Sequence, residues 1–456
     1  MTRSLVEHFE SLGLPPADAV SRNGLVSTAA SGFASRFGVR PRWRWFVPGR
    51  VEVFGKHVDY AGGRSLLAAV PRGFALVASP RTDRLVCVVD VRDGSSAQVV
   101  TPGAAGATSS DANPPGAVSG PGWSRYVRAV VERLAANFPG ASLGIDIALA
   151  SDLPRSAGLS SSSALIVGIA SALACRARLT ERAEWRESVA SPTDLAWYLG
   201  CVENGADFRT LSGAAGVGTR GGSEDHTAIV TCRSGHVSLY GFVPTVHLGD
   251  TPVPDAWTFV IAASGVRADK AGSVRERYNR ASLSTRALLD VWNARAAEPA
   301  ECLSAALRSS GEAGARLDAW IAAGHREFSA EELRTRLEHF RREDARAPLA
   351  AAAFSAADRE ALGRLAEASQ ADADGLLDNQ TPETRALADL ARRHGAFASS
   401  SFGAGFGGSV WALADATDAP RVERDWLDAY RRRFPSVDGV ESFIIRPGPA
   451  IAQLPD

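Results

Sequence analysis

Hydrophobic and polar residues follow one another along the chain in patterns that predict both strands and helices. Alternation with a period of two, typical of strands, is clear in residues 43–54 (WRWFVPGRVEVF), where a Pro-Gly turn is expected to interrupt the run. The predicted strands are residues 43–54, 66–70, 74–79, 84–91, 143–150, 257–262 and 439–446, with a strand-loop-strand around 403–408. The predicted helices, with a period near 3.6, are residues 4–13, 28–37, 126–138, 160–174, 271–294, 300–324, 358–374 and 382–394.

Mixed strands and helices without a regular βαβ rhythm favour an α+β fold over a doubly wound sheet. With 456 residues the chain exceeds the size at which a single core keeps growing, so we expect two domains. A Pro-punctuated stretch at residues 243–255 places their boundary, which gives an N-terminal domain of residues 1–245 and a C-terminal domain of residues 246–456. Residues 296–357 are rich in Arg, Glu and Ala and predict a helical insertion in the second domain.

Charge and targeting features exclude several classes of protein. The 50 basic and 51 acidic side chains leave a formal net charge of -1, which excludes a generic nucleic-acid binder. The N-terminus has no apolar stretch of the kind found in secretion signals, and the longest apolar run, residues 164–175, is too short to cross a bilayer. We therefore expect a cytoplasmic protein without a nucleic-acid or membrane partner. The 5 scattered cysteines form no CxxC pair and are expected to be reduced thiols.

Three segments carry candidate chemistry. Residues 48–63 (PGRVEVFGKHVDYAGG) gather charged and hydroxyl side chains, which fits either a solvated hairpin end or a pocket for several hydroxyls. Residues 153–165 (LPRSAGLSSSSAL) place four serines before an apolar helix, which fits a phosphate site at a helix N-terminus or a simple serine cap. Residues 399–409 (SSSFGAGFGGS) are rich in glycine and allow close approach by a ligand or a neighbouring strand.

In order and spacing these three segments resemble the signature motifs of the GHMP small-molecule kinases, a superfamily that includes homoserine, mevalonate and phosphomevalonate kinases. The first segment is most similar to the galactokinase pattern PGRVNLIGEHTDYNGG. Residues 123–127 (WSRYV) and 278–280 (YNR) also resemble elements of that branch. The resemblance covers roughly residues 30 to 415.

The resemblance implies an ATP-dependent phosphotransferase that acts on the anomeric hydroxyl of a sugar and uses Mg²⁺. It also implies a two-domain α+β architecture, in which an N-terminal domain similar to ribosomal protein S5 precedes a ferredoxin-like C-terminal domain. Nucleotide and sugar would bind in the cleft between the domains. Phosphoryl transfer of this kind depends mainly on positioning and on neutralising negative charge.

The family motifs imply roles for individual residues of this chain. Arg50 would stabilise charge on the transferred group, and Asp225, at the place of the aspartate in the family stretch C-G-I-M-D-Q, would be the base. Ser161 or Ser162 would bind Mg²⁺, with Glu203 as the candidate second ligand. The expected ATP-binding residues are Pro154, Gly158, Leu159, Ser160, Ser161, Ser162, Ser163 and Ala164. The expected sugar-binding residues are Lys56, His57, Asp59, Tyr60, Gly222 and Tyr278.

Lys56 is the most informative departure from the family, whose members carry glutamate at this position. It is one of only two lysines in the chain, and a lysine can only donate hydrogen bonds. Three interpretations remain open. Lys56 pairs with Glu224 or another local acid, it donates to a hydroxyl oxygen of galactose, or it selects a sugar with an anionic group such as a uronic acid.

The leading function predicted from the sequence is the conversion of galactose to galactose 1-phosphate. The alternatives are a related sugar or galacturonate 1-kinase and a catalytically silent sensor of sugar and ATP. The presence of Asp225 argues against the sensor, because a protein that only binds has no need of a base. The sequence predicts a monomer or small homo-oligomer and leaves open the sugar and the role of the helical insertion.

Overall fold

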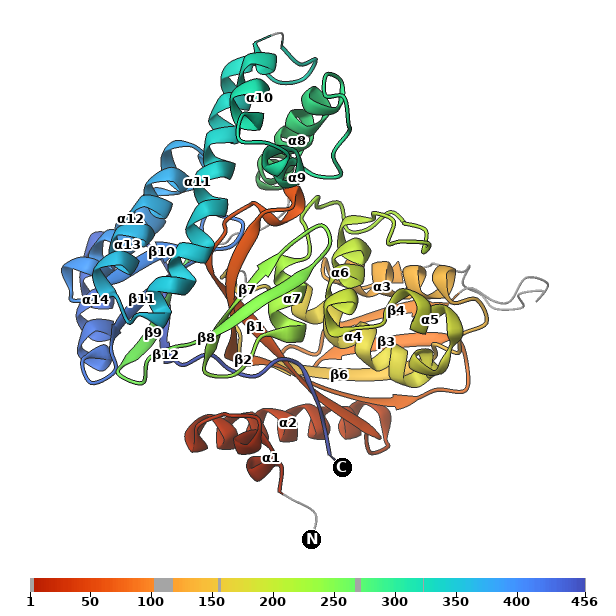
Figure 1. Cartoon of the computed structure of the whole chain (residues 1–456). Helices are drawn as coiled ribbons and strands as arrows, with labels where there is room; N and C mark the ends of the chain where they lie inside the picture. Colours follow the sequence, from red (N-terminus) through yellow and green to blue (C-terminus); the bar gives the residue numbers. More distant parts are fainter. Residues whose placement is uncertain (1–3, 102–117, 155–156, 267–271, 323, 456) are drawn as a thin grey trace.

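The computed structural model describes residues 4–101, 118–154, 157–266, 272–322 and 324–455. Residues 155 and 156 of the predicted phosphate-binding segment therefore lie outside the described residues. Two sheets lie side by side with helices on their faces, and a helical lobe extends from one end of the molecule (Figure 1). The predicted α+β class is confirmed.

The larger sheet has nine strands among the described residues, and its main path runs β13-β1-β2-β6-β3-β4-β5. Strands β7 and β8 form a hairpin attached to β2, and all neighbours are antiparallel except the parallel pair β3 and β6. The strands are β1 (Trp43–Phe54), β2 (Arg64–Pro80), β3 (Leu85–Asp90), β4 (Ser96–Val100), β5 (Val118–Ser119), β6 (Ile145–Ser151), β7 (His236–Gly241), β8 (Val246–Pro252) and β13 (Ala452–Leu454).

Helices cover both faces of the larger sheet. Helices α1 (Leu5–Ser11) and α2 (Pro16–Phe37) pack below it in the view of Figure 1, where Phe9 meets Phe46 of β1 edge to face. Helix α4 packs between the sheet and its neighbours α3 and α6, which explains why its sequence is apolar around most of its circumference. The helices of this upper face are α3 (Ser124–Asn137), α4 (Ser161–Ala177), α5 (Ala183–Ser188), α6 (Pro192–Asn204) and α7 (Glu224–Thr231), with short 3₁₀ turns at Asp59–Ala61 and Leu179–Glu181.

The smaller sheet has the strand order β10-β11-β9-β12, and all of its strands are antiparallel to their neighbours. Helices α13 and α14 form a separate apolar cluster with this sheet, and α12 packs against β10. The elements are β9 (Trp257–Ala263), β10 (Ala398–Ser401), β11 (Ser409–Asp415), β12 (Glu441–Ile445), α12 (Arg359–Gly375), α13 (Pro382–Arg393) and α14 (Ala419–Arg433).

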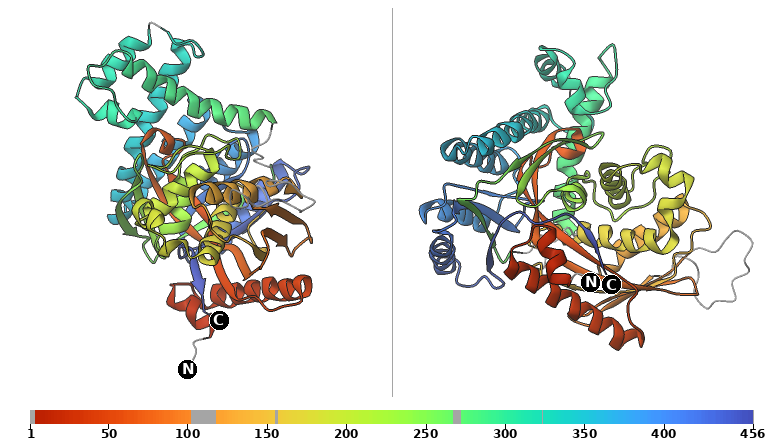
Figure 2. Two further views of the ribbon diagram at one scale, coloured as in Figure 1. Left: turned by 90° about the vertical axis from the view of Figure 1, so that its right-hand side faces the viewer. Right: turned by 60° about the horizontal axis from the view of Figure 1, so that its bottom comes forward.

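A helical lobe with its own core stands above the two sheets (Figures 1 and 2). It contains α8 (Gly272–Asn293), α9 (Leu303–Arg308), α10 (Ala313–Ile321) and the first half of α11 (Ala330–Ser355). Phe340 of α11 is buried in the lobe, whereas Phe354 near the end of the same helix is buried in the main core. Helix α11 therefore links the lobe to the body of the protein.

The predicted Pro-Gly turn in residues 43–54 is wrong. Strand β1 runs unbroken through Pro48 and Gly49, and the pairing with β2 shifts register between Pro48 and Arg50. Proline lacks the N–H that a sheet ladder uses, so a bulge accommodates it without ending the strand.

Several predicted boundaries also differ, among them the start of α2, which lies at Pro16 and not at residue 28. Residues 66–70 and 74–79 belong to the single strand β2, and the predicted helix 300–324 is divided into α9 and α10. The expected domain boundary at residue 245 falls inside the β7–β8 hairpin, so residues 246–252 lie in the larger sheet. The domain limits themselves stay a prediction.

Candidate active site

An arginine-aspartate pair stands where β1 meets the start of α7. Arg50 Nε donates to Asp225 Oδ1 at 2.7 Å, Arg50 Nη2 lies 2.6 Å from the same oxygen, and Arg50 Nη1 donates to the carbonyl of Gly158 at 2.6 Å. Burial by itself would lower the pKa of Arg50, but the neighbouring acids Asp225, Glu224 and Glu52 raise it. Arg50 therefore keeps its positive charge beside Asp225.

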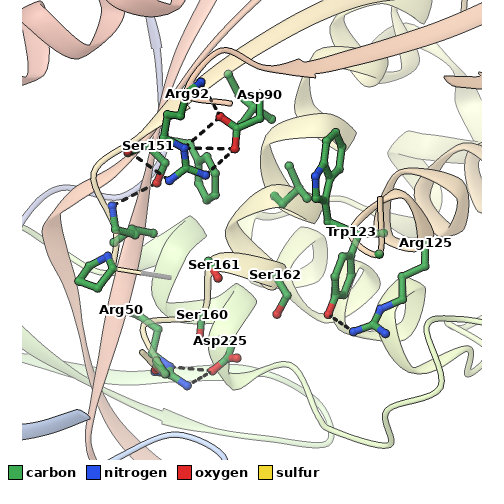
Figure 3. Close-up of a pocket in the computed structure, with 18 of the residues that line it drawn as sticks. Arg50, Asp90, Arg92, Trp123, Arg125, Ser151, Ser160, Ser161, Ser162 and Asp225 are labelled. Carbon is green, nitrogen blue, oxygen red and sulfur yellow. Dashed lines mark hydrogen bonds and ion pairs between the residues drawn. The ribbon is translucent and has the colours of Figure 1, made fainter. Parts of the chain in front are cut away.

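A cavity of about 450 Å³ lies on one side of this pair. Ser160, Ser161 and Ser162 at the N-terminus of α4 stand in the middle of its wall, with Arg50 and Asp225 at one end (Figure 3). Trp123, which caps the N-terminus of α3, and Tyr126 of α3 add aromatic surface to its lining. The free N–H groups and dipole of a helix N-terminus favour anions such as phosphates, and the aromatic surface suits a planar base.

The structure brings most of the predicted ATP-binding residues to this cavity. Pro154, Gly158, Ser160, Ser161 and Ser162 line it. Three predicted members lie elsewhere. The side chains of Leu159 and Ala164 are buried in the main core, and Ser163 faces a second cavity.

The second, narrower cavity lies on the other side of the arginine-aspartate pair. The two cavities share Arg50, Asp225 and Ala404 as lining residues, so the pair stands at the passage between them. The lining residues of the narrow cavity are Arg50, Glu52, His57, Asp59, Tyr60, Ser163, Glu203, Asn204, Thr219, Gly221, Gly222, Glu224, Asp225, His226, Tyr278, Gly403 and Ala404.

Five of the six predicted sugar-binding residues meet in the narrow cavity, and they are His57, Asp59, Tyr60, Gly222 and Tyr278. The rings of His57 and Tyr278 lie 5.2 Å apart, edge to face. Asp59 Oδ2 accepts a hydrogen bond from the backbone N–H of Glu224 at 3.1 Å, directly behind Gly222. A Cβ atom on Gly222 would lie 2.3 Å from Asp59 Oδ2, so only glycine allows this close approach.

Lys56 was predicted to bind the sugar, but it does not line the narrow cavity. Its ammonium group is buried, with Nζ 2.6 Å from Ser369 Oγ, 3.0 Å from Ser400 Oγ and 4.0 Å from Glu343 Oε1. The local acid that pairs with Lys56 is therefore Glu343 of α11 rather than Glu224. Burial by itself would raise the pKa of Glu343, but Lys56 and Arg346 outweigh it and the pKa is lowered.

Helix α11 holds the segment that carries His57, Asp59 and Tyr60. Glu343 Oε1 accepts the backbone N–H groups of Gly55 and Lys56 at 3.0 and 3.2 Å. Arg336 donates to the carbonyl of His57 and, at 3.0 Å, to the hydroxyl of Tyr60. The predicted helical insertion thus braces one wall of the narrow cavity through side chains that hydrogen bond to its backbone.

Two acids of the narrow cavity, Glu52 and Glu224, were not among the predicted site residues, although Glu224 was considered as a partner of Lys56. Burial raises the pKa of Glu52 to about 7 in spite of Arg50 and Lys56, and burial together with Glu52 and Asp59 raises that of Glu224 well above its usual value. Strand periodicity could have found Glu52, because residues two apart on a strand share a face and Arg50 was already a candidate.

Carboxylate and hydroxyl oxygens also meet behind Asp225. Ser163 Oγ lies 2.9 Å from Glu203 Oε2 and 3.4 Å from Asp225 Oδ2, and His226 Nε2 lies 3.2 Å from the same oxygen of Glu203. Within the described part of the chain, no group of three or more His, Cys, Asp or Glu side chains could hold a metal ion by itself.

Three family models match the chain in the order of its motifs. Residues 31–80 match the galactokinase galactose-binding signature, residues 125–189 the N-terminal domain of GHMP kinases, and residues 350–432 the C-terminal domain of GHMP kinases. The chain belongs to the GHMP kinase superfamily. The matched regions contain Arg50, the first helical turns of α4 and the glycine-rich loop between β10 and β11.

Curated relatives of this GHMP kinase include the galactokinase of Roseiflexus sp., 28% identical over 87% of this chain and 90% of the relative. The galactokinase of Homo sapiens is also 28% identical, over 89% of this chain and 92% of the human protein. This GHMP kinase is a phosphotransferase with an alcohol group as acceptor, as predicted.

Solved structures agree on the fold. The Lactococcus lactis galactokinase complexed with galactose superposes with a TM-score of 0.72, at 20% identity over 94% of this chain and 99% of that chain. The Methanococcus jannaschii mevalonate kinase superposes with a TM-score of 0.52, at 13% identity over 89% and 98% of the two chains. The predicted two-domain GHMP kinase architecture is confirmed.

Proposed function

We propose that this GHMP kinase transfers the γ-phosphoryl group of ATP to the anomeric hydroxyl of galactose, which yields galactose 1-phosphate and ADP. The observation that carries the proposal is the position of Arg50 and Asp225 in the passage between a cavity suited to a nucleotide and a narrow polar cavity. The galactokinase signature over residues 31–80 and the galactokinase relatives support galactose as the acceptor.

In this proposal Asp225 accepts or orients the proton of the attacking hydroxyl. Its pairing with Arg50 at 2.6–2.7 Å favours the ionised carboxylate, the form able to accept a proton. Arg50 also stabilises negative charge that spreads over the transferred phosphoryl group. Ser160, Ser161 and Ser162 with the α4 N-terminus hold the phosphates of ATP.

The oxygens near Asp225 fit the preference of Mg²⁺ for hard ligands. Glu203, with Ser161 or Ser162 as predicted and Ser163 as an addition from the geometry, would hold the ion together with the phosphates of ATP. Magnesium usually takes one or two carboxylates plus substrate phosphates, so a cage of three protein acids is not required. The bound ion would neutralise phosphate charge during transfer.

The galacturonate alternative loses its structural argument, because Lys56 is paired with Glu343 outside the narrow cavity. A sensor that only binds remains an outcome of the test below. Among the described residues, no helix has both the length and the apolar character needed to span a membrane. A cytoplasmic location and a monomer or small homo-oligomer stay predictions.

A panel of hexoses and uronic acids with ATP and Mg²⁺ tests the proposed function. We expect galactose-dependent release of ADP, with a kcat/KM for galactose at least about 10-fold above that for glucose or galacturonate. Loss of the reducing end and a new phosphomonoester signal would identify the 1-phosphate. Binding of ATP and galactose with no turnover would favour the sensor, and turnover of another sugar alone would replace galactose as the substrate.

The Gly222→Ala variant is expected to raise the KM for galactose by about 10-fold or more, because its new methyl group displaces Asp59 from the cavity wall. The KM for ATP should stay nearly constant, since Gly222 does not line the larger cavity. Gly24→Ala on α2 is the matched control, because a Cβ there meets open space. An unchanged KM for galactose in Gly222→Ala would remove this wall from the sugar site.

A further inference from the structure

The side chain of Glu52 brings an acceptor without a donor to the wall of the narrow cavity. Glu52 is 2% exposed, lines the cavity, and its Oε2 accepts the backbone N–H of Gly403 at 2.8 Å. Its other oxygen, Oε1, is buried and has no hydrogen-bond partner among the described residues. A buried acceptor without a donor costs free energy, so native proteins rarely keep one unless something else supplies the donor.

The neighbouring cations Arg50 and Lys56 make their hydrogen bonds with groups other than Glu52. Arg50 donates to Asp225 and to the carbonyl of Gly158. Lys56 donates to Ser369 and Ser400 and faces Glu343. Both cations favour the charge of Glu52 through space, but neither makes a hydrogen bond with it in this structure.

We propose that Glu52 is a specificity-determining residue of the sugar site, whose Oε1 accepts a hydrogen bond from one hydroxyl or ammonium group of the substrate. The inference rests on the proposed function and deepens it. The sequence singled out Lys56 as the residue that selects the sugar. The structure instead favours Glu52 on β1, four residues earlier, for this role.

The charges of the cavity define the class of substrate. Among the described residues, one arginine, Arg50, and five carboxyl side chains line it, and the carboxyl groups belong to Glu52, Asp59, Glu203, Glu224 and Asp225. A uronic acid would add a further negative charge to this enclosure, which like-charge repulsion opposes. A neutral hexose, or one that carries an amino group at the position facing Glu52, supplies the donor without that cost.

Binding measured by calorimetry without turnover tests the inference, with galactose and its 2-, 3-, 4- and 6-deoxy forms as probes. Glu52→Ala is expected to weaken galactose binding by about 10- to 100-fold, the usual effect of losing a hydrogen bond to a charged group. One deoxy sugar should bind the wild type and Glu52→Ala almost equally, because it lacks the hydroxyl that Glu52 accepts. Glu52→Gln should fall between them, since its amide oxygen can still accept.

Two controls separate recognition from folding. Glu338→Gln on α11 removes an exposed acid that pairs with Arg342 at the surface, and it should bind galactose like the wild type. Because Glu52 has its pKa raised to about 7, its ionisation above that pH costs folding free energy. Glu52→Gln should therefore unfold no more easily than the wild type above pH 7, although it binds galactose more weakly.

Several results would overturn the inference. The inference is wrong if Glu52→Ala binds galactose with an affinity within about 3-fold of the wild type. It is also wrong if Glu52→Ala loses the same affinity for all four deoxy sugars, because an equal loss indicates a structural role. Wild-type protein binding galacturonate as tightly as galactose would refute the substrate class without any variant. If the wild type phosphorylates galactose but one of these overturning results is obtained, the inference is wrong and the proposed function stands. If it phosphorylates no hexose, the proposed function fails by itself.

Discussion

Replacing Asp225 with asparagine is expected to lower kcat by about 10²- to 10⁴-fold, the range that a positioned general base contributes. Asparagine keeps the size of the side chain but cannot take up the proton of the attacking hydroxyl. It also removes the carboxylate that lies 2.6–2.7 Å from the guanidinium of Arg50. Steady-state release of ADP with saturating ATP and galactose measures the effect.

The affinity for ATP should change little in Asp225→Asn, because the serine segment and the aromatic surface of α3 remain in place. Asp255→Asn is the matched control. Asp255 is fully exposed and pairs with Arg446 at the surface, so this variant should keep the wild-type kcat. A fall of less than about 10-fold in Asp225→Asn would show that Asp225 positions the sugar without acting as a base.

Replacing Lys56 with glutamate is expected to lower the free energy of unfolding by about 3–5 kcal/mol, the cost of breaking a buried ion pair by removing one partner. The new carboxylate would stand beside Glu343, whose side chain is fully buried and already charged. Ser369 and Ser400 would also lose their cationic donor. Denaturant unfolding followed by fluorescence or circular dichroism measures the change.

The Lys56→Met/Glu343→Gln double variant provides the comparison. The amide oxygen of glutamine can still accept the N–H groups of Gly55 and Lys56, and both charges leave together. The double variant should therefore lose less stability than the sum of the two single variants, which defines a coupling between them. If Lys56→Glu kept wild-type stability and instead raised galactose turnover relative to galacturonate, Lys56 would act on the substrate after all.

The sequence predicted which residues meet at the passage because they belong to short segments. Arg50, the serine segment and Asp225 each belong to a motif with its own local geometry, a strand end or a helix N-terminus. Those local geometries persist in the fold, so the predicted residues meet at the same two cavities. The α+β class followed in the same way from hydrophobic periodicity.

Lys56 could not be placed from its neighbours in the sequence. It follows Gly55, whose positive φ of 105° ends the regular alternation of β1, so periodicity no longer decides which way the next side chain points. Its ionic partner Glu343 comes from a helix that composition alone marked only as amphipathic. The unbroken β1 strand was missed for a similar reason, since a Pro-Gly pair predicts a turn unless a partner strand can bulge around it.

The contacts of α11 also bear on the order in which the protein can fold during synthesis. Glu343 accepts the N–H of Gly55 across 288 residues, and Gly403 donates to Glu52 across 351 residues. Contacts between segments so far apart form late, because a long stretch of chain must first be made and closed into a loop. A nascent chain that has released the whole larger-sheet region up to β8 therefore still lacks a finished sugar cavity, and the binding site is completed only when the last quarter of the protein leaves the ribosome.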